Sequence, residues 1–329
     1  MVRFGLLGAG RIGQVHGRNI AASGRAELIA LADPDRGAAE RLASRTGAAV
    51  REPDAILVAK DVDAILIATP TDTHADLIEA AAAAGKAILC EKPVSLSVER
   101  IETCLAAVAR AGVPLMIGFH RRYDPNFAAL EKRLRAGEAG DIEIVTICCR
   151  DPTPPPVSYI ARSGGIFRDM TIHDFDMARF LLAEEPVVVH ALGGVLVDAA
   201  IGKAGDIDTA AIHMQTASGR ICVITGSRRA TYGHDQRIEV HGSKGMLRAG
   251  NVHLTTVELA DGRGMASDLI PFSFIERYEE AYRRELDAFL DALEKGVAPR
   301  ADGRDGLMAQ KLAEAATLSW SSGNAVKVA

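Results

Sequence analysis

Short apolar runs alternate with amphipathic segments through the first third of the chain. The runs are Val2–Leu7, Leu28–Ala32, Ala64–Ala68, Ala87–Cys90 and Leu115–Phe119. The segments between them have helical apolar spacing and comprise Ile12–Ser23, Ala38–Thr46, Asp76–Ala84 and Leu96–Ala111. Apolar strands that alternate with helices are typical of a parallel sheet covered on both faces. We therefore predict an α/β fold that begins with a Rossmann doubly wound domain over residues 1–120.

The pattern changes beyond residue 120, where strand-like runs follow one another with short turns between them. These runs are Ile142–Cys149, Val187–Val197, Thr209–Thr216, Arg220–Thr225, Gln236–His241, Gly245–Leu247 and Val252–Leu259. Helical patterns remain at Pro125–Ala136, Phe167–Leu182, Glu276–Leu293 and Asp305–Ser321. Successive strands joined by short turns indicate antiparallel pairing. Residues 121–329 are therefore predicted to form a second α/β domain with an open, mostly antiparallel sheet.

A glycine-rich turn lies between the first predicted strand and the first predicted helix. It consists of Gly8, Ala9, Gly10, Arg11, Ile12 and Gly13. In such a strand–turn–helix context, the first glycine permits a tight turn and the second lets a pyrophosphate approach the backbone. The third glycine lets the helix pack closely on the strand. The backbone N–H groups at the helix start favour an anion, so the turn predicts a dinucleotide site.

Asp33 ends the second apolar run, twenty residues after Gly13. A carboxylate at this point accepts hydrogen bonds from ribose hydroxyls and repels a 2′-phosphate, which favours NAD over NADP. Arg36 is close enough to hold a 2′-phosphate, and the alternative interpretation of Arg36 is a solvated residue near a helix start. We predict NAD as the cofactor and include Asp33 and Arg36 in its site.

Composition narrows the class of partner. The chain has 329 residues, long enough for two domains, and a net charge of -5 without a basic block, which argues against a nucleic-acid partner. No apolar stretch is long enough to span a membrane, and the start of the chain does not resemble a signal peptide. The five cysteines have no CxxC spacing and are typical of reduced thiols. We expect a cytoplasmic protein.

Three segments carry candidate chemistry. Lys92, within Glu91-Lys92-Pro93, follows a predicted parallel strand and should lie at the same sheet edge as the glycine-rich turn. It could stabilise negative charge on a substrate oxygen, or it could be an ordinary surface lysine. In a single helix, Asp169, His173 and Asp176 would share one face.

Histidine beside carboxylate is suited to accept a hydroxyl proton near neutral pH. The alternatives are a solvated polar stripe and a metal site, and the lack of a second His or Cys nearby argues against the metal. Tyr232, at the end of a predicted strand, could hydrogen-bond a polyol or belong to a polar turn. We predict no metal ion.

Taken together, these motifs resemble the glucose–fructose oxidoreductase / inositol dehydrogenase family over the whole chain. The resemblance rests on the glycine-rich turn, the Ala68–His74 segment, Glu91-Lys92-Pro93 and the Asp169…His173 pair, and residues 165–176 and 228–244 are especially similar to bacterial inositol 2-dehydrogenases. The run of prolines in Asp151–Pro156 departs from the family pattern. The resemblance implies a substrate domain that often assembles tetramers, and we expect a homotetramer.

The resemblance also implies roles for individual residues. Lys92 would contact both nicotinamide and substrate, His173 would accept the proton, and Asp169 would complete the catalytic set. Arg122 and Tyr232 match substrate-contact positions, and Asp176 is added from the same helix face. The positions expected to line the NAD site are Thr69, Pro70, His74 and Glu91.

The expected activity is NAD-dependent oxidation of a cyclic polyol, with myo-inositol converted to 2-keto-myo-inositol (scyllo-inosose). Another polyol or aldose is the alternative substrate, with scyllo-inositol, chiro-inositol and glucose as candidates. A further alternative, from a different class of protein, is a catalytically silent NAD-binding sugar sensor.

Overall fold

The computed structural model describes residues 1–328, which divide into two compact units. The first unit comprises residues 1–123 and 280–310, and the second comprises residues 124–279 and the described residues from 311 onward. The predicted boundary after residue 120 lies close to the first break between the units. Residues 280–310, however, belong to the first unit and not to the second domain to which the sequence analysis assigned them.

The first unit is built on a six-stranded parallel sheet in the order β3-β2-β1-β4-β5-β6. Its strands are β1 (Val2–Leu7), β2 (Ala26–Ala32), β3 (Ala49–Val50), β4 (Ala64–Ile67), β5 (Ala87–Cys90) and β6 (Leu115–Ile117). The strand order reverses on either side of β1, as in a doubly wound sheet. The predicted Rossmann fold is confirmed.

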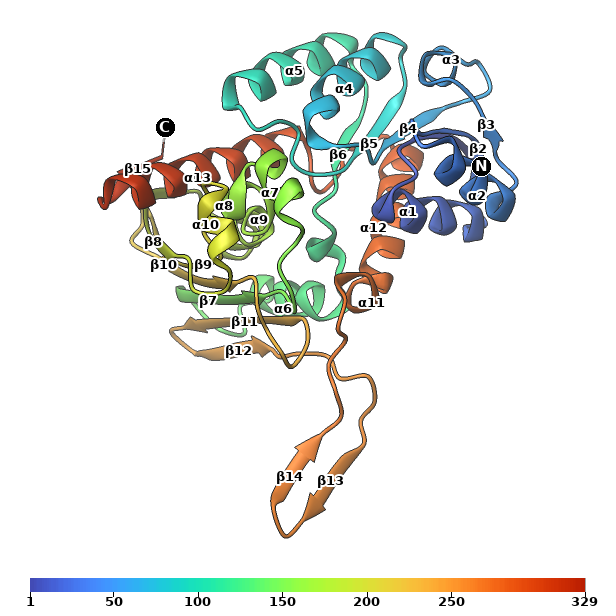
Figure 1. Ribbon diagram of the computed structural model, residues 1–329. Helices are drawn as coiled ribbons and strands as arrows, with labels where there is room; N and C mark the ends of the chain where they lie inside the picture. Colours follow the sequence, from blue (N-terminus) through green and yellow to red (C-terminus); the bar gives the residue numbers. More distant parts are fainter. Residues whose placement is uncertain (329) are drawn as a thin grey trace. The chain divides into compact units, whose positions relative to one another are not determined.

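Helices flank this sheet, as its apolar strands require. They are α1 (Arg11–Ala22), α2 (Arg36–Thr46), α3 (Pro53–Leu57), α4 (His74–Ala83) and α5 (Val98–Ala111), with 3-10 turns η1 (Thr71–Thr73) and η2 (His120–Tyr123). Figure 1 shows α4 and α5 side by side near β5 and β6, and α1 beside α2. The two-residue strand β3 and the short helix α3 had no detectable periodicity in the sequence.

Helix α12 (Glu279–Lys295) belongs to the first unit because its apolar face packs into that unit's core. Phe289 and Leu290 are fully buried in one cluster with Phe4 and Leu31 of the sheet, and the Phe289 ring lies 6.0 Å from that of Phe4. Burial of two such side chains stabilises the contact by roughly 3–6 kcal/mol. The sequence pattern identified the helix but not the sheet that it covers.

The second unit contains a seven-stranded sheet in the order β12-β11-β7-β10-β9-β8-β15. Neighbouring strands are antiparallel except for the parallel pair β7 and β10, so the mostly antiparallel sheet is confirmed. Its strands are β7 (Ile142–Arg150), β8 (Pro186–Gly194), β9 (Thr209–Thr216), β10 (Ile221–Ser227), β11 (Asp235–Gly242), β12 (Gly245–Ala249) and β15 (Val326–Lys327).

One face of this second sheet is covered and the other is more open. Figure 1 shows helices α8 (Gly165–Asp169), α9 (Ile172–Leu182) and α13 (Gly303–Ser322) over one face. In β9 and β10 alternate residues are buried, while those between them are partly or fully exposed. The remaining helices of this unit are α6 (Pro125–Arg135), α7 (Val157–Ser163), α10 (Ala199–Lys203) and α11 (Phe274–Arg277).

The strand predicted at Val252–Leu259 is wrong. Residues 252–257 form no strand, and a hairpin of β13 (Glu258–Asp261) and β14 (Gly264–Ser267) follows and extends away from the sheet in Figure 1. The alternating apolar residues that suggested a sheet strand are exposed here: Leu254 is 57% and Val257 71% exposed. We call residues 252–272 the arm.

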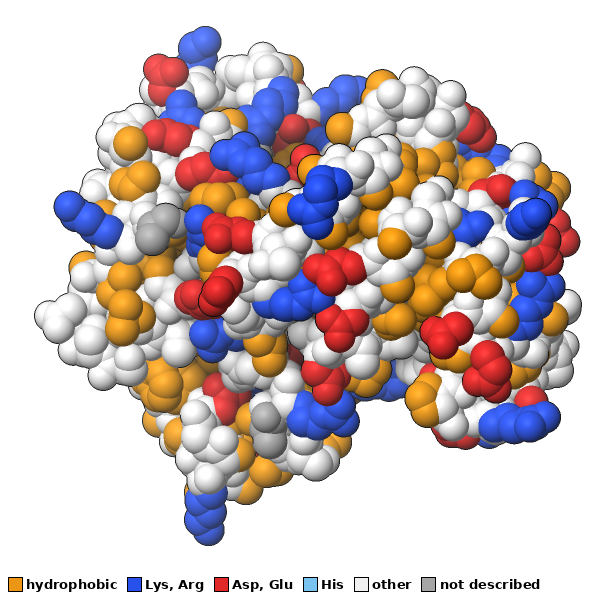
Figure 2. Space-filling model, turned by 90° about the horizontal axis from the view of Figure 1, so that it is seen from above, with side chains coloured by type: hydrophobic (Ala, Val, Ile, Leu, Met, Phe, Trp, Pro, Cys, Tyr) orange, Lys and Arg blue, Asp and Glu red, His pale blue; other side chains and the backbone are white. Residues whose placement is uncertain are grey.

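The distribution of surface charge and the apolarity of the helices concern two kinds of partner, nucleic acids and membranes. On the face drawn in Figure 2, basic and acidic side chains are interspersed and not gathered into one block. Among residues 1–328, the helices include none with the length and apolarity needed to cross a bilayer.

Candidate functional site

The glycine-rich turn has the backbone geometry that a dinucleotide requires. Gly8 has a positive φ of 101°, and a Cβ at this residue would lie 2.4 Å from the Ala68 carbonyl oxygen. A Cβ at Gly13 would lie 2.0 Å from the Gly8 carbonyl oxygen. Around Gly10, in contrast, the space within 4 Å of an added Cβ is empty, and Gly10 caps α1 without a side-chain hydrogen bond. The turn is thus closed on the protein side and open where a pyrophosphate would approach.

Asp33 is fixed at the carboxyl end of β2 by the same turn. Its Oδ2 accepts a hydrogen bond of 2.6 Å from the Ala9 N–H, and its Oδ1 accepts one of 2.7 Å from the Asp35 N–H. A carboxylate oxygen has more than one lone pair, so both oxygens can still accept from ribose hydroxyls. The Arg36 side chain is 86% exposed and pairs with Glu40 at 2.9 Å. This arrangement favours the unphosphorylated ribose of NAD.

His74 links two loops at the carboxyl edge of the first sheet. It is buried at the start of α4, with Nδ1 2.7 Å from the Pro93 carbonyl oxygen and Nε2 2.8 Å from the Thr69 carbonyl oxygen. Burial lowers the pKa of His74, while the two carbonyl contacts act in the opposite direction. The imidazole therefore ties the Thr69-Pro70 segment to the Lys92-Pro93 segment, which makes His74 a positioning residue for both.

Lys92 lies where the sequence predicted, directly after β5 and partly buried. Since β1 and β5 are strands of one parallel sheet, the glycine-rich turn and Lys92 share its carboxyl edge. The Lys92 N–H donates to the Glu91 Oε2 at 3.3 Å, and Glu91 Oε1 lies 2.8 Å from His16 Nε2. The Lys92–Pro93 peptide is cis. The backbone that presents the lysine is thus held by the side chain before it.

Arg122, a predicted substrate contact, is buried in η2 and bound within the first unit. Its Nη2 lies 2.9 Å from Asp305 Oδ1, and its Nη1 donates to the Arg300 carbonyl oxygen at 2.6 Å. No local pattern indicated this pairing, because Asp305 follows Arg122 by 183 residues. The guanidinium anchors η2 to the start of α13, and its substrate role stays a prediction.

The second group of candidate residues, Asp169, His173 and Asp176, lies in the second unit. The single predicted helix over Phe167–Leu182 is wrong, because Met170 and Thr171 separate α8 from α9. The Thr171 N–H bonds to the Ile166 carbonyl five residues back, which widens the turn at this point. Asp169 ends α8, whereas His173 and Asp176 belong to α9. Only His173 and Asp176 therefore belong to one helix, whereas the sequence had predicted a common helix face for all three residues.

These three side chains differ in their surroundings. His173 is buried, with 8% of its surface exposed. Asp176 is buried as well and lies 3.8 Å from Arg179, which also pairs with Glu185 at 2.6 Å. Asp176 is thus part of a buried ion pair on α9, and its substrate role stays a prediction.

Asp169 is held by residues that the sequence analysis did not single out. Tyr159 Oη donates to its Oδ1 at 3.0 Å, and Arg228 Nη1 lies 3.6 Å from its Oδ2. Arg228 is only 1% exposed and also lies 3.4 Å from Asp206. The pairing of Arg228 with two carboxylates depends on tertiary packing, so no local pattern could indicate it. The Arg228 guanidinium thus provides a charge partner for the largely buried Asp169 carboxylate.

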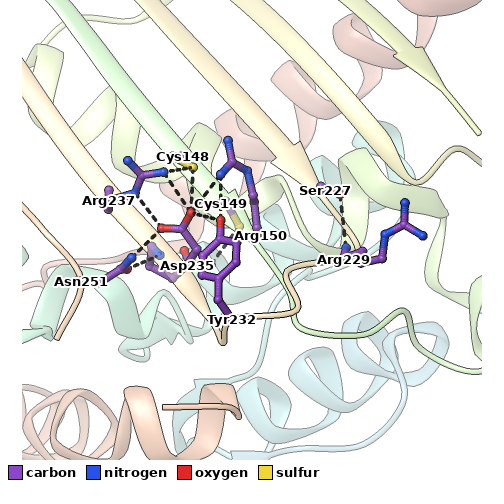
Figure 3. A network of polar contacts seen from close by, with 10 residues as sticks. Cys148, Cys149, Arg150, Ser227, Arg229, Tyr232, Asp235, Arg237 and Asn251 are labelled. Carbon is purple, nitrogen blue, oxygen red and sulfur yellow. Dashed lines mark hydrogen bonds and ion pairs between the residues drawn. The ribbon is translucent and has the colours of Figure 1, made fainter. Parts of the chain in front are cut away.

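Tyr232 belongs to a polar network on the second sheet, which Figure 3 shows. Its hydroxyl donates to Asp235 at 2.7 Å and accepts from Arg150 at 2.8 Å. Asp235 also accepts from Arg237 and Asn251, both at 2.7 Å. These partners hold the pKa of Asp235 well below its usual range despite its burial, which acts the other way. Half of the Tyr232 side chain is exposed, and its contact with substrate stays a prediction.

Comparison with known proteins identifies the class. A family model described as an oxidoreductase family with an NAD-binding Rossmann fold matches residues 2–119, and its companion for the C-terminal alpha/beta domain matches residues 131–328. The chain therefore belongs to the glucose–fructose oxidoreductase / inositol dehydrogenase (Gfo/Idh/MocA) family of oxidoreductases, as the motifs indicated. Its N-terminal domain is an NAD-binding domain, in agreement with the geometry of Gly8, Gly10, Gly13 and Asp33.

Individual relatives are similar over their full length. The inositol 2-dehydrogenase of Rhizobium meliloti is 54% identical over 100% of this chain and 99% of the relative, and the myo-inositol 2-dehydrogenase of Thermotoga maritima is 43% identical over 99% and 98%. The structure of scyllo-inositol dehydrogenase from Lactobacillus casei with bound NAD(H) and scyllo-inositol has a TM-score of 0.92 at 29% identity, covering 100% of this chain and 99% of the other.

Proposed function

We propose that this protein is an NAD-dependent inositol 2-dehydrogenase that oxidises myo-inositol to 2-keto-myo-inositol (scyllo-inosose). The observation that carries the proposal is full-length similarity at 54% identity to an inositol 2-dehydrogenase in a chain that has Lys92, Asp169 and His173 together. The R. meliloti and T. maritima relatives, the latter a myo-inositol 2-dehydrogenase, exceed the scyllo-inositol enzyme of L. casei in identity, which favours myo-inositol.

Oxidation of a secondary alcohol removes a hydride from carbon and a proton from oxygen. NAD, when bound, supplies the hydride acceptor. His173 accepts the hydroxyl proton, since a neutral imidazole is a base near neutral pH. Asp169 orients His173 and stabilises its charged form, while the Lys92 ammonium stabilises the developing alkoxide. Tyr159 and Arg228, through their contacts with Asp169, fix that carboxylate.

The cofactor and substrate contacts complete the proposal. The cofactor site comprises the glycine-rich turn, Asp33 and Arg36, together with Thr69, Pro70, His74, Glu91 and Lys92. Substrate hydroxyls are bound by Lys92, Asp169 and His173, and also by Arg122, Asp176 and Tyr232.

We expect His173→Ala to lower kcat by roughly 10²–10⁴-fold with myo-inositol and NAD, because it removes the general base. NAD affinity should be unchanged, since the NAD-binding domain does not include this residue. His213→Ala, which replaces an exposed histidine on β9, is the matched control. A His173→Ala variant with near-full activity would refute the assignment.

A polyol panel separates myo-inositol from its alternatives. NADH formation is measured with myo-inositol, scyllo-inositol, chiro-inositol and glucose, and each is repeated with NADP. The proposal requires the highest kcat/KM with myo-inositol and NAD. Cofactor binding without turnover of any polyol would instead support a sugar sensor.

The assembly and location of the protein are part of the same proposal. We propose a homotetramer in the cytoplasm. Apolar side chains exposed on the arm and on the open sheet favour self-association: Leu259 is 54%, Met265 75% and Leu192 56% exposed. All five cysteines are buried, and a set of buried thiols is common in proteins of a reducing compartment.

A further inference from the structure

A buried polar cluster lies beneath the Glu91-Lys92 turn and has no assigned role. It comprises His16 of α1, Glu91 after β5 and Glu285 of α12, all in the first unit. A ring nitrogen of His16 and one carboxyl oxygen from each glutamate all lie within 4.8 Å of one another, and all three side chains are buried. Each comes from a different element of the sequence, so no local motif could have indicated the cluster.

Glu285 is the unusual member. Its residue is 0% exposed, and within residues 1–328 neither carboxyl oxygen has a hydrogen-bond partner. An ionised carboxylate with no donor in an apolar interior is costly by several kcal/mol, and a buried group of this kind becomes neutral instead. The second acid beside it, Glu91, adds like-charge repulsion.

The groups around the cluster explain which acid is protonated. Glu91 has donors: the His16 ring nitrogen is 2.8 Å from Oε1, and the Lys92 N–H is 3.3 Å from Oε2. Backbone at Gly118 packs against it so closely that a Cβ would lie 3.0 Å from Oε2. The other titratable side chains at this point are Tyr282, with its ring edge-on to His16, and His120, which stacks on Tyr282 at 4.5 Å. Charge is therefore stabilised on Glu91 and not on Glu285.

We propose that Glu285 is a neutral carboxylic acid beside Glu91, and that its O–H turns toward the Glu91 carboxylate, which lies within 4.8 Å. A proton on Glu285 removes the repulsion that two buried carboxylates would exert on each other. Burial and the neighbouring Glu91 charge both raise the pKa of Glu285, consistent with this state.

The consequence is a positioning role for Glu285. Glu91 holds the Lys92 backbone, so a proton that fixes Glu91 also fixes the start of the Lys92-Pro93 turn. The link to catalysis rests on the proposed role of Lys92. The protonation state of Glu285 does not depend on that role. Glu285 contacts neither reacting atom and acts only through Glu91.

The test of protonation is infrared spectroscopy of the full chain. We expect a carboxylic-acid C=O band at neutral pH that disappears in Glu285→Gln and persists in Glu279→Gln, an exposed position on the same helix. The glutamine is neutral, nearly the same shape, and keeps an N–H donor for Glu91. Absence of the band from the native protein at neutral pH, or its persistence in Glu285→Gln, overturns the proposal.

Stability against pH gives a second, independent readout. A group with a raised folded pKa stabilises the fold fully below its unfolded pKa, and this contribution is lost as pH rises towards the folded pKa. The unfolding equilibrium constant of the native protein should thus rise relative to that of Glu285→Gln by up to about tenfold per pH unit above roughly pH 4.5. A constant ratio from pH 5 to pH 8 contradicts the proposal.

Two further measurements separate the remaining outcomes. A bound divalent cation would appear as stoichiometric metal in the purified protein, lost together with thermal stability in Glu285→Gln, and would overturn the protonated state of Glu285. For the positioning role, Glu285→Ala should lower kcat at least tenfold while Glu285→Gln restores it to within threefold. Equal rates for Ala and Gln overturn that role. If the band behaves as expected but no polyol is oxidised, the proposed function fails and the protonated pair stands.

Discussion

At the residue scale, most candidate side chains are held in place by charged or polar partners far away in the sequence. Arg122 is bound by Asp305, 183 residues further along the chain, and Arg228 lies beside both Asp169 and Asp206. The Tyr232 hydroxyl donates to Asp235, a 1% exposed carboxylate that Arg150, 85 residues away, also contacts. Local patterns indicated Lys92, Asp169 and His173, but no pattern indicated Asp305, Asp206 or Asp235 as binding partners.

The Asp235 network should make a measurable contribution to stability. Asp235→Asn leaves Arg150 and Arg237 without their carboxylate and should destabilise the second unit by about 3 kcal/mol. Since the folded pKa of Asp235 is lowered, its contribution is complete above the unfolded pKa of about 3.9 and decreases as pH falls through the folded value. The difference between native and variant proteins should therefore shrink below about pH 4.

The fluorescence of Trp320 can be used to measure the stability of the second unit. Trp320 is the single tryptophan of the chain, lies in the second unit and packs on Phe167 at 6.5 Å between ring centroids. Urea unfolding is followed by its fluorescence at pH 7 and at about pH 2.5, below the unfolded pKa of an aspartate. Glu239→Gln, on the same strand, should change stability by less than about 0.5 kcal/mol. Equal stability of Asp235→Asn and the native protein would show that the network contributes nothing.

At the element scale, the glycines of the β1–α1 turn serve different purposes: Gly13 is needed for folding, whereas Gly10 is needed for cofactor binding. Gly13→Ala should destabilise the first unit by about 1–3 kcal/mol, because its Cβ would lie 2.0 Å from backbone that cannot move freely. Gly10→Ala has open space and a φ of −67°, so we expect its stability to be unchanged. Its NAD affinity should fall at least about tenfold, since the methyl group would stand where the pyrophosphate approaches.

Thermal unfolding and calorimetric titration with NAD measure the two effects. Gly24→Ala has open surroundings and should alter neither quantity. Native NAD affinity in Gly10→Ala would contradict the assignment of the turn, whatever the result for Gly13→Ala.

At the scale of the whole molecule, the arm is the feature that a single chain does not explain. Its apolar residues extend into solvent on a two-stranded hairpin, which by itself is marginally stable. If the protein is a homotetramer, Leu259→Ser together with Met265→Ser should reduce the assembled mass measured by sedimentation velocity. NAD affinity should be retained, because the NAD-binding domain is unchanged.

Arg263→Ser, at the tip of the same hairpin, is the control and should leave the mass unchanged. A native protein that sediments as a monomer would disprove the tetramer, and an unchanged tetramer in the double variant would show that the arm is not part of its interfaces.

The sequence by itself determined those features that depend on neighbouring residues. Strands β1 and β5 and the glycine-rich turn follow from patterns within a few positions, because apolar periodicity and glycine geometry are local properties. The family, and with it the NAD-binding domain, followed from motifs of the same short range.

Only the tertiary structure decided what depends on packing between distant segments. It placed α12 in the first unit, interrupted the helix between Asp169 and His173, and paired Arg228 with Asp169. It also brought Glu285 to Glu91 across almost two hundred residues of sequence. No local pattern specifies such pairs, since their energy arises from burial and charge compensation that exist only after the chain has folded.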